Sequence, residues 1–285
     1  MLTRFAPAKI NLALDILCKR PDGYHEIDTV MQSIALADQL TFEVSSGLEL
    51  TCSDSRLPTD HHNLAWKAAE LLQRELGIGR GVKIHIHKNI PIEAGLAGGS
   101  TDAAEVLLAL NEFWNLGLST DELVSLGSGL GADVPFCIRR GSFRAGGIGE
   151  RLTKIHSTMR CDLLLITPNT PISTAKAYGR YSKERILKRP QVDGVVRAME
   201  TGDLELLTNS WGNVFEELVL GDFPGVGQVK KVFRQYGLTA NLMSGSGPSV
   251  YALNPPPEVI KPIFTAIPGE WFRCYTHFLE EPESK

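Results

Sequence analysis

The first half of the chain contains one glycine-rich stretch between two patterned segments. It reads Pro91-Ile-Glu-Ala-Gly-Leu-Ala-Gly-Gly-Ser-Thr-Asp-Ala-Ala-Glu105. Before it, residues 82–87 alternate apolar and polar side chains, which is the period-two pattern of a strand buried on one face. After it, apolar side chains between Ala103 and Leu110 recur at helical spacing. The stretch therefore predicts a loop that joins a strand to a helix.

The composition of this loop favours a phosphate site. Gly95, Gly98 and Gly99 permit positive φ and leave room for a ligand beside the main chain. The run from Ser100 to Asp102 offers good N-cap side chains, so we expect the helix to begin there. The free N–H groups of a first helical turn and the helix dipole attract anions such as phosphate. A tight connection without a ligand is the alternative interpretation.

Two well-known phosphate loops do not match, and a third does. No Lys-Ser or Lys-Thr pair closes the stretch, so it is not a Walker A loop, and Ala97 breaks the Rossmann spacing G-x-G-x-x-G. The stretch instead resembles the phosphate loop of the GHMP kinases, P-x-x-x-G-L-G-G-G-S-S. The matching residues are Pro91, Gly95, Leu96, Gly98, Gly99 and Ser100.

Two positions depart from the GHMP pattern. Thr101 replaces a serine and keeps the hydroxyl. Ala97 replaces a glycine, and because alanine disfavours positive φ we expect a negative φ at this position.

Composition sets limits on every functional hypothesis. The chain has 285 residues, 43% hydrophobic and 22% charged, which is enough for one large or two modest globular domains. A net charge of −4 gives no reason to expect nucleic acid or an anionic membrane as a partner. We expect no signal segment and no membrane span, which needs an apolar run of roughly 18 residues. Five scattered cysteines without a C-x-x-C pair fit a reduced cytoplasm.

Two N-terminal segments narrow the resemblance. The first, Pro7-Ala-Lys-Ile-Asn-Leu12, lies in an expected strand that carries Lys9 and Asn11 on one face. The second, Arg20-Pro-Asp-Gly-Tyr-His25, contains a Pro-Asp-Gly turn signal. Together they resemble the P-A-K-x-N-L and R-x-D-G-Y-H signature of one branch of the GHMP kinases. Those kinases act in the non-mevalonate isoprenoid pathway on a cytidine diphosphate-linked methylerythritol.

This branch implies a cytosine site and an acceptor site. By resemblance, Tyr24 would stack on the cytosine and His25 would hydrogen-bond its edge. Asn11 is also an expected substrate-binding residue. From the residues alone, the Tyr-His turn could equally pack against the sheet, and the Lys-Ile-Asn strand could be a solvated edge. Thr174 and Tyr178 match a segment that lies against the acceptor in the family.

Asp133 is the expected catalytic base. It lies in Gly127-Ser-Gly-Leu-Gly-Ala-Asp-Val-Pro-Phe136 with no Lys or Arg within five positions. A buried carboxylate needs a specific partner, although an aspartate before Pro135 could also cap the next turn. The segment matches the G-A-D-V-P motif of the family, whose aspartate is the base. The resemblance pairs it with Lys9, which would hold the base and stabilise the emerging alkoxide.

The resemblance also implies ATP and Mg²⁺. Asn63 and Leu64 open an expected helix that runs to Leu76, and in the family this opening lies near the adenine. Mg²⁺ would bridge the β- and γ-phosphates, with Ser100 or Thr101 as possible ligands. The third motif of the family, which meets the phosphate and acceptor site, matches Gly245 and Ser246. From the residues alone this turn reads as a hairpin.

Several other expectations follow from patterns along the chain. Residues 41–50 alternate as one strand, residues 151–158 read as a crossing or a linker, and Ser119 caps a helix. His61, His62, His85 and His87 share no fixed spacing, so a zinc site is not expected.

The whole chain is therefore expected to adopt an α/β (α+β) two-domain GHMP kinase fold. The resemblance implies a ribosomal-protein-S5-like domain over residues 1–157 and a ferredoxin-like α/β domain over residues 158–285, with the active site in the cleft between them. A monomer or homodimer that binds only small molecules is expected. The alternatives are another GHMP kinase, acting on homoserine, mevalonate or a sugar, and a non-catalytic nucleotide- or metabolite-binding protein of the same fold.

Overall fold

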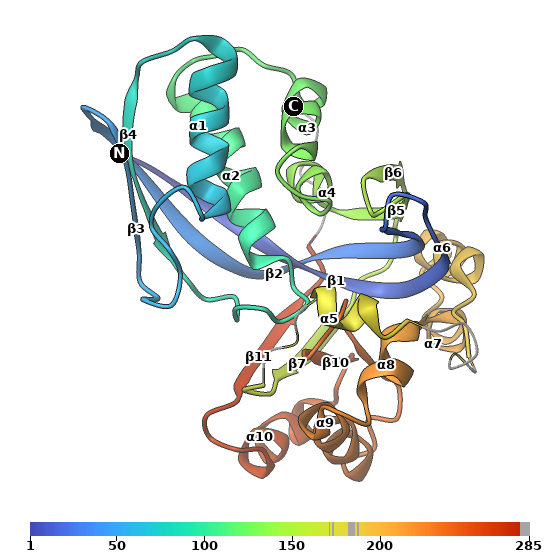
Figure 1. Ribbon diagram of the computed structural model, residues 1–285. Coiled ribbons are helices and arrows are strands. Elements are labelled where there is room, and N and C mark those ends of the chain that lie inside the picture. Colours follow the sequence, from blue (N-terminus) through green and yellow to red (C-terminus); the bar gives the residue numbers. More distant parts are fainter. Residues whose placement is uncertain (171, 173, 182–185, 187, 280–285) are drawn as a thin grey trace. The chain divides into compact units, whose positions relative to one another are not determined.

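The computed structural model describes residues 1–170, 172, 174–181, 186 and 188–279 (Figure 1). Contacts divide the chain into two compact units. Unit 1 comprises Met1–Ala8, Leu36–Ile90 and Ala97–Arg140, and unit 2 comprises Lys9–Ala35, Pro91–Leu96 and the chain from Gly141 onward. Strands β1 (Leu2–Lys19) and β2 (His25–Ser45) contribute residues to both units. The domain boundary expected between residues 157 and 158 stays a prediction.

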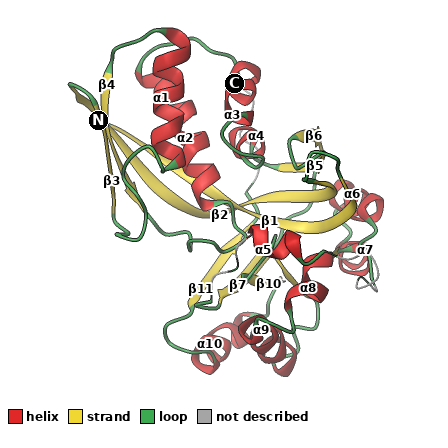
Figure 2. Cartoon of the chain, in the orientation of Figure 1, coloured by secondary structure: helices red, strands yellow, loops and turns green. Residues whose placement is uncertain are grey.

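Unit 1 is a sheet covered by helices. Strand β4 (Gly81–His87) pairs in parallel with β3 (Leu48–Cys52) and antiparallel with β2, in the order β3-β4-β2-β1 (Figure 2). The helices are α1 (Leu64–Leu76), α2 (Gly98–Phe113), α3 (Thr120–Ser128) and α4 (Val134–Arg139). Val82, Ile84 and Ile86 are fully buried, which confirms the predicted strand with one buried face.

Local signals account for the ends of two helices in unit 1. The Asn63 side chain accepts a hydrogen bond from Ala65 at the start of α1, and Gly77 ends this helix in the left-handed conformation. Ser119 and Glu122 form a capping box at the start of α3. Both helices begin where the sequence predicts. The single strand predicted over residues 41–50 is wrong, because β2 ends at Ser45 and β3 begins only at Leu48.

Unit 2 contains the remaining strands of the first sheet. β5 (Ser142–Gly146) pairs antiparallel with β2, β6 (Arg151–Lys154) pairs with β5, and β8 (Gly212–Asn213) pairs in parallel with β1. The interpretation of residues 151–158 as a crossing or linker is therefore incomplete, because β6 forms within it. The signal is weak because β6 has four residues and buries none of them fully.

A second sheet and its helices form the rest of unit 2. Its order is β11 (Phe272–His277), β7 (Asp162–Thr167), β10 (Val250–Leu253) and β9 (Asn241–Met243), with antiparallel neighbours. The helices are α5 (Thr174–Gly179), α6 (Val192–Thr201), α7 (Leu204–Ser210), α8 (Val214–Val219), α9 (Pro224–Gln235) and α10 (Pro257–Ala266). Leu164, Ile166 and Val250 of the sheet share one buried core with Phe233 of α9 and Ile263 of α10. None of the helices in the described residues is long and apolar enough to cross a membrane.

Candidate active site

The first half of the glycine loop is built against the turn between β9 and β10 in unit 2. Gly95 has φ +73°, and a Cβ atom there would lie 2.2 Å from the carbonyl oxygen of Ser244. Glycine is therefore required twice over, by backbone conformation and by close approach. The hydroxyl of Ser244 donates to the carbonyl oxygen of Gly95 at 2.8 Å, and so ties the loop to the third predicted motif.

The second half of the loop begins helix α2 in unit 1, and it corrects two predictions. The helix starts at Gly98, not within Ser100 to Asp102, because Gly98 and Gly99 themselves adopt helical conformation. Ala97 occupies the N-cap position with φ 59° and ψ 29°. The negative φ expected there is wrong: the chain makes a left-handed turn at an alanine. The Thr101 N–H donates to the Ala97 carbonyl oxygen at 2.8 Å and closes this turn.

The start of α2 has an open side that suits an anion. Gly99 is exposed, and the nearest atom to a Cβ built on it is Leu64 Cδ1, at 3.8 Å. First-turn N–H groups have no partner within a helix, so they are available to phosphate. Leu64, which is expected near the adenine, thus borders the glycine loop. Asn63 caps α1 and also donates to the carbonyl oxygen of Pro58 at 2.8 Å.

The two hydroxyls after the glycines differ in availability. Thr101 is 1% exposed, and its hydroxyl donates to the carbonyl oxygen of Pro7 at 2.7 Å. Ser100 is half-buried, and its Oγ lies 4.0 Å from where a Cβ of Gly131 would be. Ser100 therefore borders the segment that carries Asp133, and it is the better placed of the two predicted metal ligands.

Asp133 immediately precedes helix α4 in unit 1. It occupies the N-cap position with φ −84° and ψ −14°, but its side chain makes no capping hydrogen bond to the helix. The capping interpretation of this aspartate is therefore wrong. Its side chain is half-buried. A half-buried carboxylate that does not cap its own helix is suited to a role in catalysis.

Lys9 and Asn11 lie side by side in unit 2, on the predicted face of β1. Lys9 is 5% exposed and Asn11 is 2% exposed. The Lys9 ammonium donates to Asn11 Oδ1 at 2.7 Å, and the Asn11 amide donates to Thr29 Oγ1 at 2.8 Å. The solvated-edge alternative for this strand is therefore wrong. The Lys9 N–H also donates to the carbonyl oxygen of Leu96 at 3.2 Å, which joins β1 to the glycine loop.

The third motif converges on the same place. The backbone N–H of Asn11 donates to Ser244 Oγ at 3.3 Å, and a Cβ on Gly245 would lie 3.4 Å from Asn11 Oδ1. Ser246 is 7% exposed within this turn. The Asn213 amide donates to the carbonyl oxygen of Gly245 at 2.7 Å and so stabilises the turn.

Sequence reasoning missed several residues that support this convergence. Ser244 directly precedes the predicted Gly245 and Ser246, so the motif could have identified Ser244 as a site residue. Asn213 and Thr29 carry no such signal. Tyr251 is fully buried and donates to the carbonyl oxygen of Asn11 at 2.8 Å, a contact between residues 240 positions apart.

The predicted cytosine and acceptor residues form an aromatic group in unit 2. The His25 ring stacks on Tyr178 with centroids 5.2 Å apart, and Tyr178 meets Phe215 edge to face. Tyr24 is 60% exposed beside them in sequence. Burial, and then the charge of Lys19, lowers the pKa of His25, so its imidazole is neutral at pH 7. Thr174 opens α5, and its side chain lies outside the described residues.

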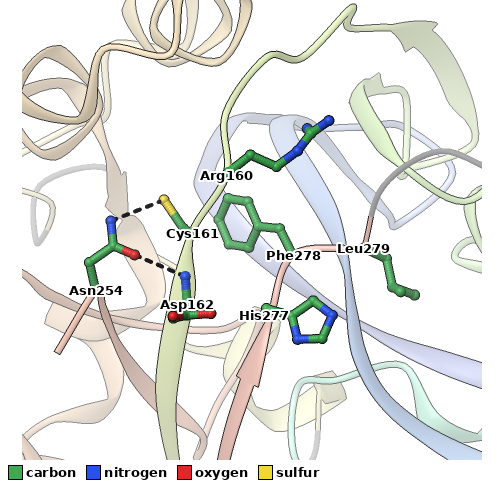
Figure 3. Close-up of a pocket in the computed structure, with 7 residues that line it drawn as sticks. All are labelled: Arg160, Cys161, Asp162, Asn254, His277, Phe278 and Leu279. Carbon is green, nitrogen blue, oxygen red and sulfur yellow. Dashed lines mark hydrogen bonds between the residues drawn. The ribbon is translucent and has the colours of Figure 1, made fainter. Parts of the chain in front are cut away.

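Two other features of the described residues lie apart from these side chains. A hollow at the ends of β7 and β11 is lined by Arg160, Cys161, His277 and Phe278 among others, and contains none of the predicted site residues (Figure 3). Asp60, His61 and His62 form an exposed group in the loop before α1, with ligand atoms within 4.8 Å of one another. His85 and His87 belong to β4 instead. All five cysteines are free.

Comparison with known proteins gives the class and then the family. Residues 63–141 match the family model described as GHMP kinases N terminal domain. A solved homoserine kinase from Cytophaga hutchinsonii has the same fold, with a TM-score of 0.76 at 20% identity over 98% of this chain and 95% of that one. The chain therefore contains the N-terminal domain of the GHMP kinases and has the predicted α/β fold.

The more similar relatives share one name. A 4-diphosphocytidyl-2-C-methyl-D-erythritol kinase from Geobacillus sp. (strain WCH70) is 43% identical over 93% of this chain and 92% of its own length. The corresponding kinase from Enterococcus faecalis (strain ATCC 700802 / V583) is 43% identical over 87% of this chain and 88% of its own. A crystal structure of 4-(cytidine 5'-diphospho)-2C-methyl-D-erythritol kinase aligns with a TM-score of 0.82 at 32% identity, covering 97% of this chain and 99% of that one. The chain belongs to the family of 4-diphosphocytidyl-2-C-methyl-D-erythritol kinases.

Proposed function

We propose that this protein transfers the γ-phosphate of ATP to the 2-hydroxyl of 4-diphosphocytidyl-2-C-methyl-D-erythritol, giving the 2-phosphate and ADP. The acceptor oxygen forms a bond to the γ-phosphorus, the bond from that phosphorus to the β,γ-bridging oxygen breaks, and the hydroxyl proton passes to a base. The step belongs to the non-mevalonate pathway of isoprenoid precursors.

The observation that carries the proposal is the hydrogen-bonded convergence in unit 2. Lys9 and Ser244 both bond the first half of the glycine loop, and Asn11 bonds Lys9 and Ser244. Phosphoryl transfer needs a buried cation and a phosphate cradle in one place, since it depends on positioning and charge stabilisation. Lys9 supplies that cation, and Gly95 with Leu96 begins the cradle.

The remaining catalytic roles extend from this convergence. Asp133 acts as the base, and Lys9 stabilises the emerging alkoxide. Gly98, Gly99 and the first turn of α2 receive the ATP phosphates, and Asn63 with Leu64 borders the adenine. Ser100 would hold Mg²⁺ at the ATP phosphates, where the ion would offset the charge that develops during transfer, because Thr101 is only 1% exposed.

The acceptor is held by residues of unit 2. Tyr24 stacks on the cytosine and neutral His25 bonds its edge, and Tyr178 packs on the His25 ring. Thr174, Gly245 and Ser246 complete the contacts to the acceptor. The domain boundary at residue 157, a site in the cleft between the domains, a cytoplasmic location and a monomeric or homodimeric state belong to the same proposal.

The roles of Asp133 and Lys9 are tested by Asp133→Asn and Lys9→Ala. We expect each to lower kcat by about 10²- to 10⁴-fold, because each removes a proton acceptor or a charge used in the transition state. The measurement is ADP release with the cytidyl acceptor, with binding of ATP followed separately. Asp193→Asn is the matched control, since this carboxylate is 90% exposed, and it should turn over like the wild type.

Three outcomes separate the proposal from its alternatives. Wild-type turnover in either variant contradicts the mechanism. Turnover of homoserine, mevalonate or a sugar alcohol, but not of the cytidyl compound, identifies another GHMP kinase. Tight binding of nucleotide without turnover of any acceptor identifies a binding protein.

A further inference from the structure

The ring of His25 is enclosed by two tyrosines of unit 2. Tyr178 stacks against one face with an interplanar angle of 28°, and Tyr181 meets the ring edge to face, with centroids 5.3 Å apart and an angle of 76°. A stacked ring and an edge-on ring therefore contact the imidazole from two directions. Such aromatic pairs prefer these two arrangements.

The Tyr181 side chain is hydrogen-bonded to strand β1. Its hydroxyl donates to the carbonyl oxygen of Ile16 at 3.2 Å. Arg189 donates to the same carbonyl oxygen at 2.9 Å. The Tyr181 hydroxyl and Arg189 therefore share one acceptor on β1, which is 165 positions from Tyr181 in the sequence.

An ion pair completes this support. Arg189 donates to the carboxylate of Asp15, which is 6% exposed. Burial raises the pKa of Asp15, which Arg189 partly offsets. The Arg189 side chain is 33% exposed, whereas the side chain of Asp15 is 9% exposed. The ion pair therefore links a buried residue of β1 to a partly exposed guanidinium. A chain of contacts thus runs from Asp15 through Arg189 and the carbonyl oxygen of Ile16 to Tyr181 and His25.

We propose that Tyr181 is a positioning residue for base recognition, which fixes the orientation of the His25 imidazole and thereby sets the preference for cytosine over uracil. The inference rests on the proposed function and adds a residue outside the signature segments. Tyr181 acts through His25 and does not itself contact the base.

The physical reason lies in the hydrogen-bonding edges of the two bases. Cytosine presents an amino donor and a ring-nitrogen acceptor where uracil presents a carbonyl acceptor and an N–H donor. A neutral imidazole has one donor and one acceptor nitrogen. A freely rotating imidazole can offer either nitrogen to the base, whereas a ring held in one orientation with one tautomer favours one base.

Simple packing makes a different prediction. Tyr178 and Tyr181 both pack against the core of unit 2. If Tyr181 only fills space, its removal lowers stability and affects all substrates alike. Base preference is therefore the measurement that distinguishes positioning from packing.

The test compares Tyr181→Leu and Tyr181→Phe with the wild type, using cytidine and uridine diphosphate-linked acceptors. We expect Tyr181→Leu to raise the KM of the cytidine acceptor and lower the cytidine-to-uridine ratio of kcat/KM by about three- to tenfold, the scale of one aromatic pair. The KM of ATP should stay within about twofold. Tyr181→Phe keeps the ring but loses the hydrogen bond to Ile16. Its cytidine-to-uridine ratio of kcat/KM should therefore lie between those of the wild type and Tyr181→Leu.

Tyr275→Phe provides the control, because its hydroxyl bonds Asp162 at 2.7 Å at the edge of the second sheet, away from His25. An unchanged base ratio in Tyr181→Leu, or an equal loss for both acceptors and ATP, overturns the inference. If Tyr181→Leu does not fold, an unchanged ratio in Tyr181→Phe together with an unchanged KM overturns it.

Calorimetric titration with CMP and UMP separates this inference from the proposed function. Absence of wild-type turnover, with a CMP preference that Tyr181→Leu loses, refutes the function and supports the inference. If the wild type turns over the acceptor but Tyr181→Leu keeps the preference for CMP, the function is supported and the inference is refuted.

Discussion

Ala97 is the residue at which local preference and structure disagree most. Its φ of 59° lies in the left-handed region that alanine disfavours, and it stands between Leu96 and the first residue of α2. The loop pattern of the family has glycine here. The strain is held in place because Leu96 accepts from Lys9 on one side and Ala97 accepts from Thr101 on the other.

Ala97→Gly is therefore expected to stabilise the protein. Relief of left-handed strain is worth about 1–2 kcal/mol, less the added flexibility of glycine in the unfolded chain. We expect the melting temperature to rise by about 2–4 °C per kcal/mol gained. Differential scanning calorimetry is the measurement. Ala94→Gly is the control, because Ala94 is buried without positive φ, and it should lower the melting temperature.

At the scale of elements, the helix that follows Asp133 is positioned by close packing on α3. A Cβ atom on Gly127 of α3 would lie 2.8 Å from Ile138 Cδ1 and 2.8 Å from Val134 Cγ1, both in α4. It would also lie 3.3 Å from Leu107 Cδ1 of α2. Three helices of unit 1 therefore meet at a point with no room for a methyl group.

Gly127→Ala should consequently force α4 away from α3. Overpacking of this kind costs about 1–3 kcal/mol, more than the gain in helix propensity. We expect lower stability to urea and reduced kcat, because α4 begins next to Asp133. Gly227→Ala in α9 is the matched control: no atom lies within 4 Å of its Cβ, so it should be neutral or stabilising. Equal effects of the two substitutions would contradict the packing argument.

Elements differ in how well the sequence predicts them. Helices α1 and α3 carry complete start signals in Asn63 and in the Ser119–Glu122 box, and both were predicted correctly. The predicted start of α2 is wrong because its N-cap residue is an alanine in the left-handed conformation. This alanine makes no side-chain capping bond that the sequence could indicate. Strand β6 was missed because its pairing with β5 comes from the sheet and not from its own alternation.

At the scale of the whole molecule, a buried charge group joins three elements of unit 1. Lys88, after β4, donates to Asp38 of β2 and to Asp102 of α2, and all three side chains are at most 5% exposed. Asp38 also accepts the N–H groups of Asn89 and Ile90. Asp102 Oδ1 is buried without a hydrogen-bond partner. One cation therefore serves two carboxylates.

This group predicts a pH-dependent global stability. Burial, only partly offset by Lys88, raises the pKa of Asp102 from 3.8 to about 7. Between these values the folded protein holds a proton that the unfolded chain has lost, so stability falls as pH rises from about 4 to about 7 and levels off above. The contribution is up to about 4 kcal/mol, at about 1.4 kcal/mol per pKa unit.

Asp102→Asn should abolish this dependence. Its free energy of unfolding, measured by urea titration between pH 5 and pH 8, should rise relative to the wild type as pH increases. The exposed Asp121→Asn, whose side chain is 81% exposed, should follow the wild-type curve. Parallel curves for wild type and Asp102→Asn would show that Asp102 is ionised throughout.

Sequence patterns alone are enough to predict the strand-loop-helix unit around Gly95 to Ser100, most helix and strand positions, and the family. These features depend on spacing and turn chemistry within short windows, which the order of residues encodes directly. Tertiary structure alone decided the left-handed turn at Ala97, the bond from Ser244 to Gly95 and the support of His25 by Tyr181 and Arg189. Those contacts join residues up to 173 positions apart, so they exist only once the sheets have set which strands and turns meet.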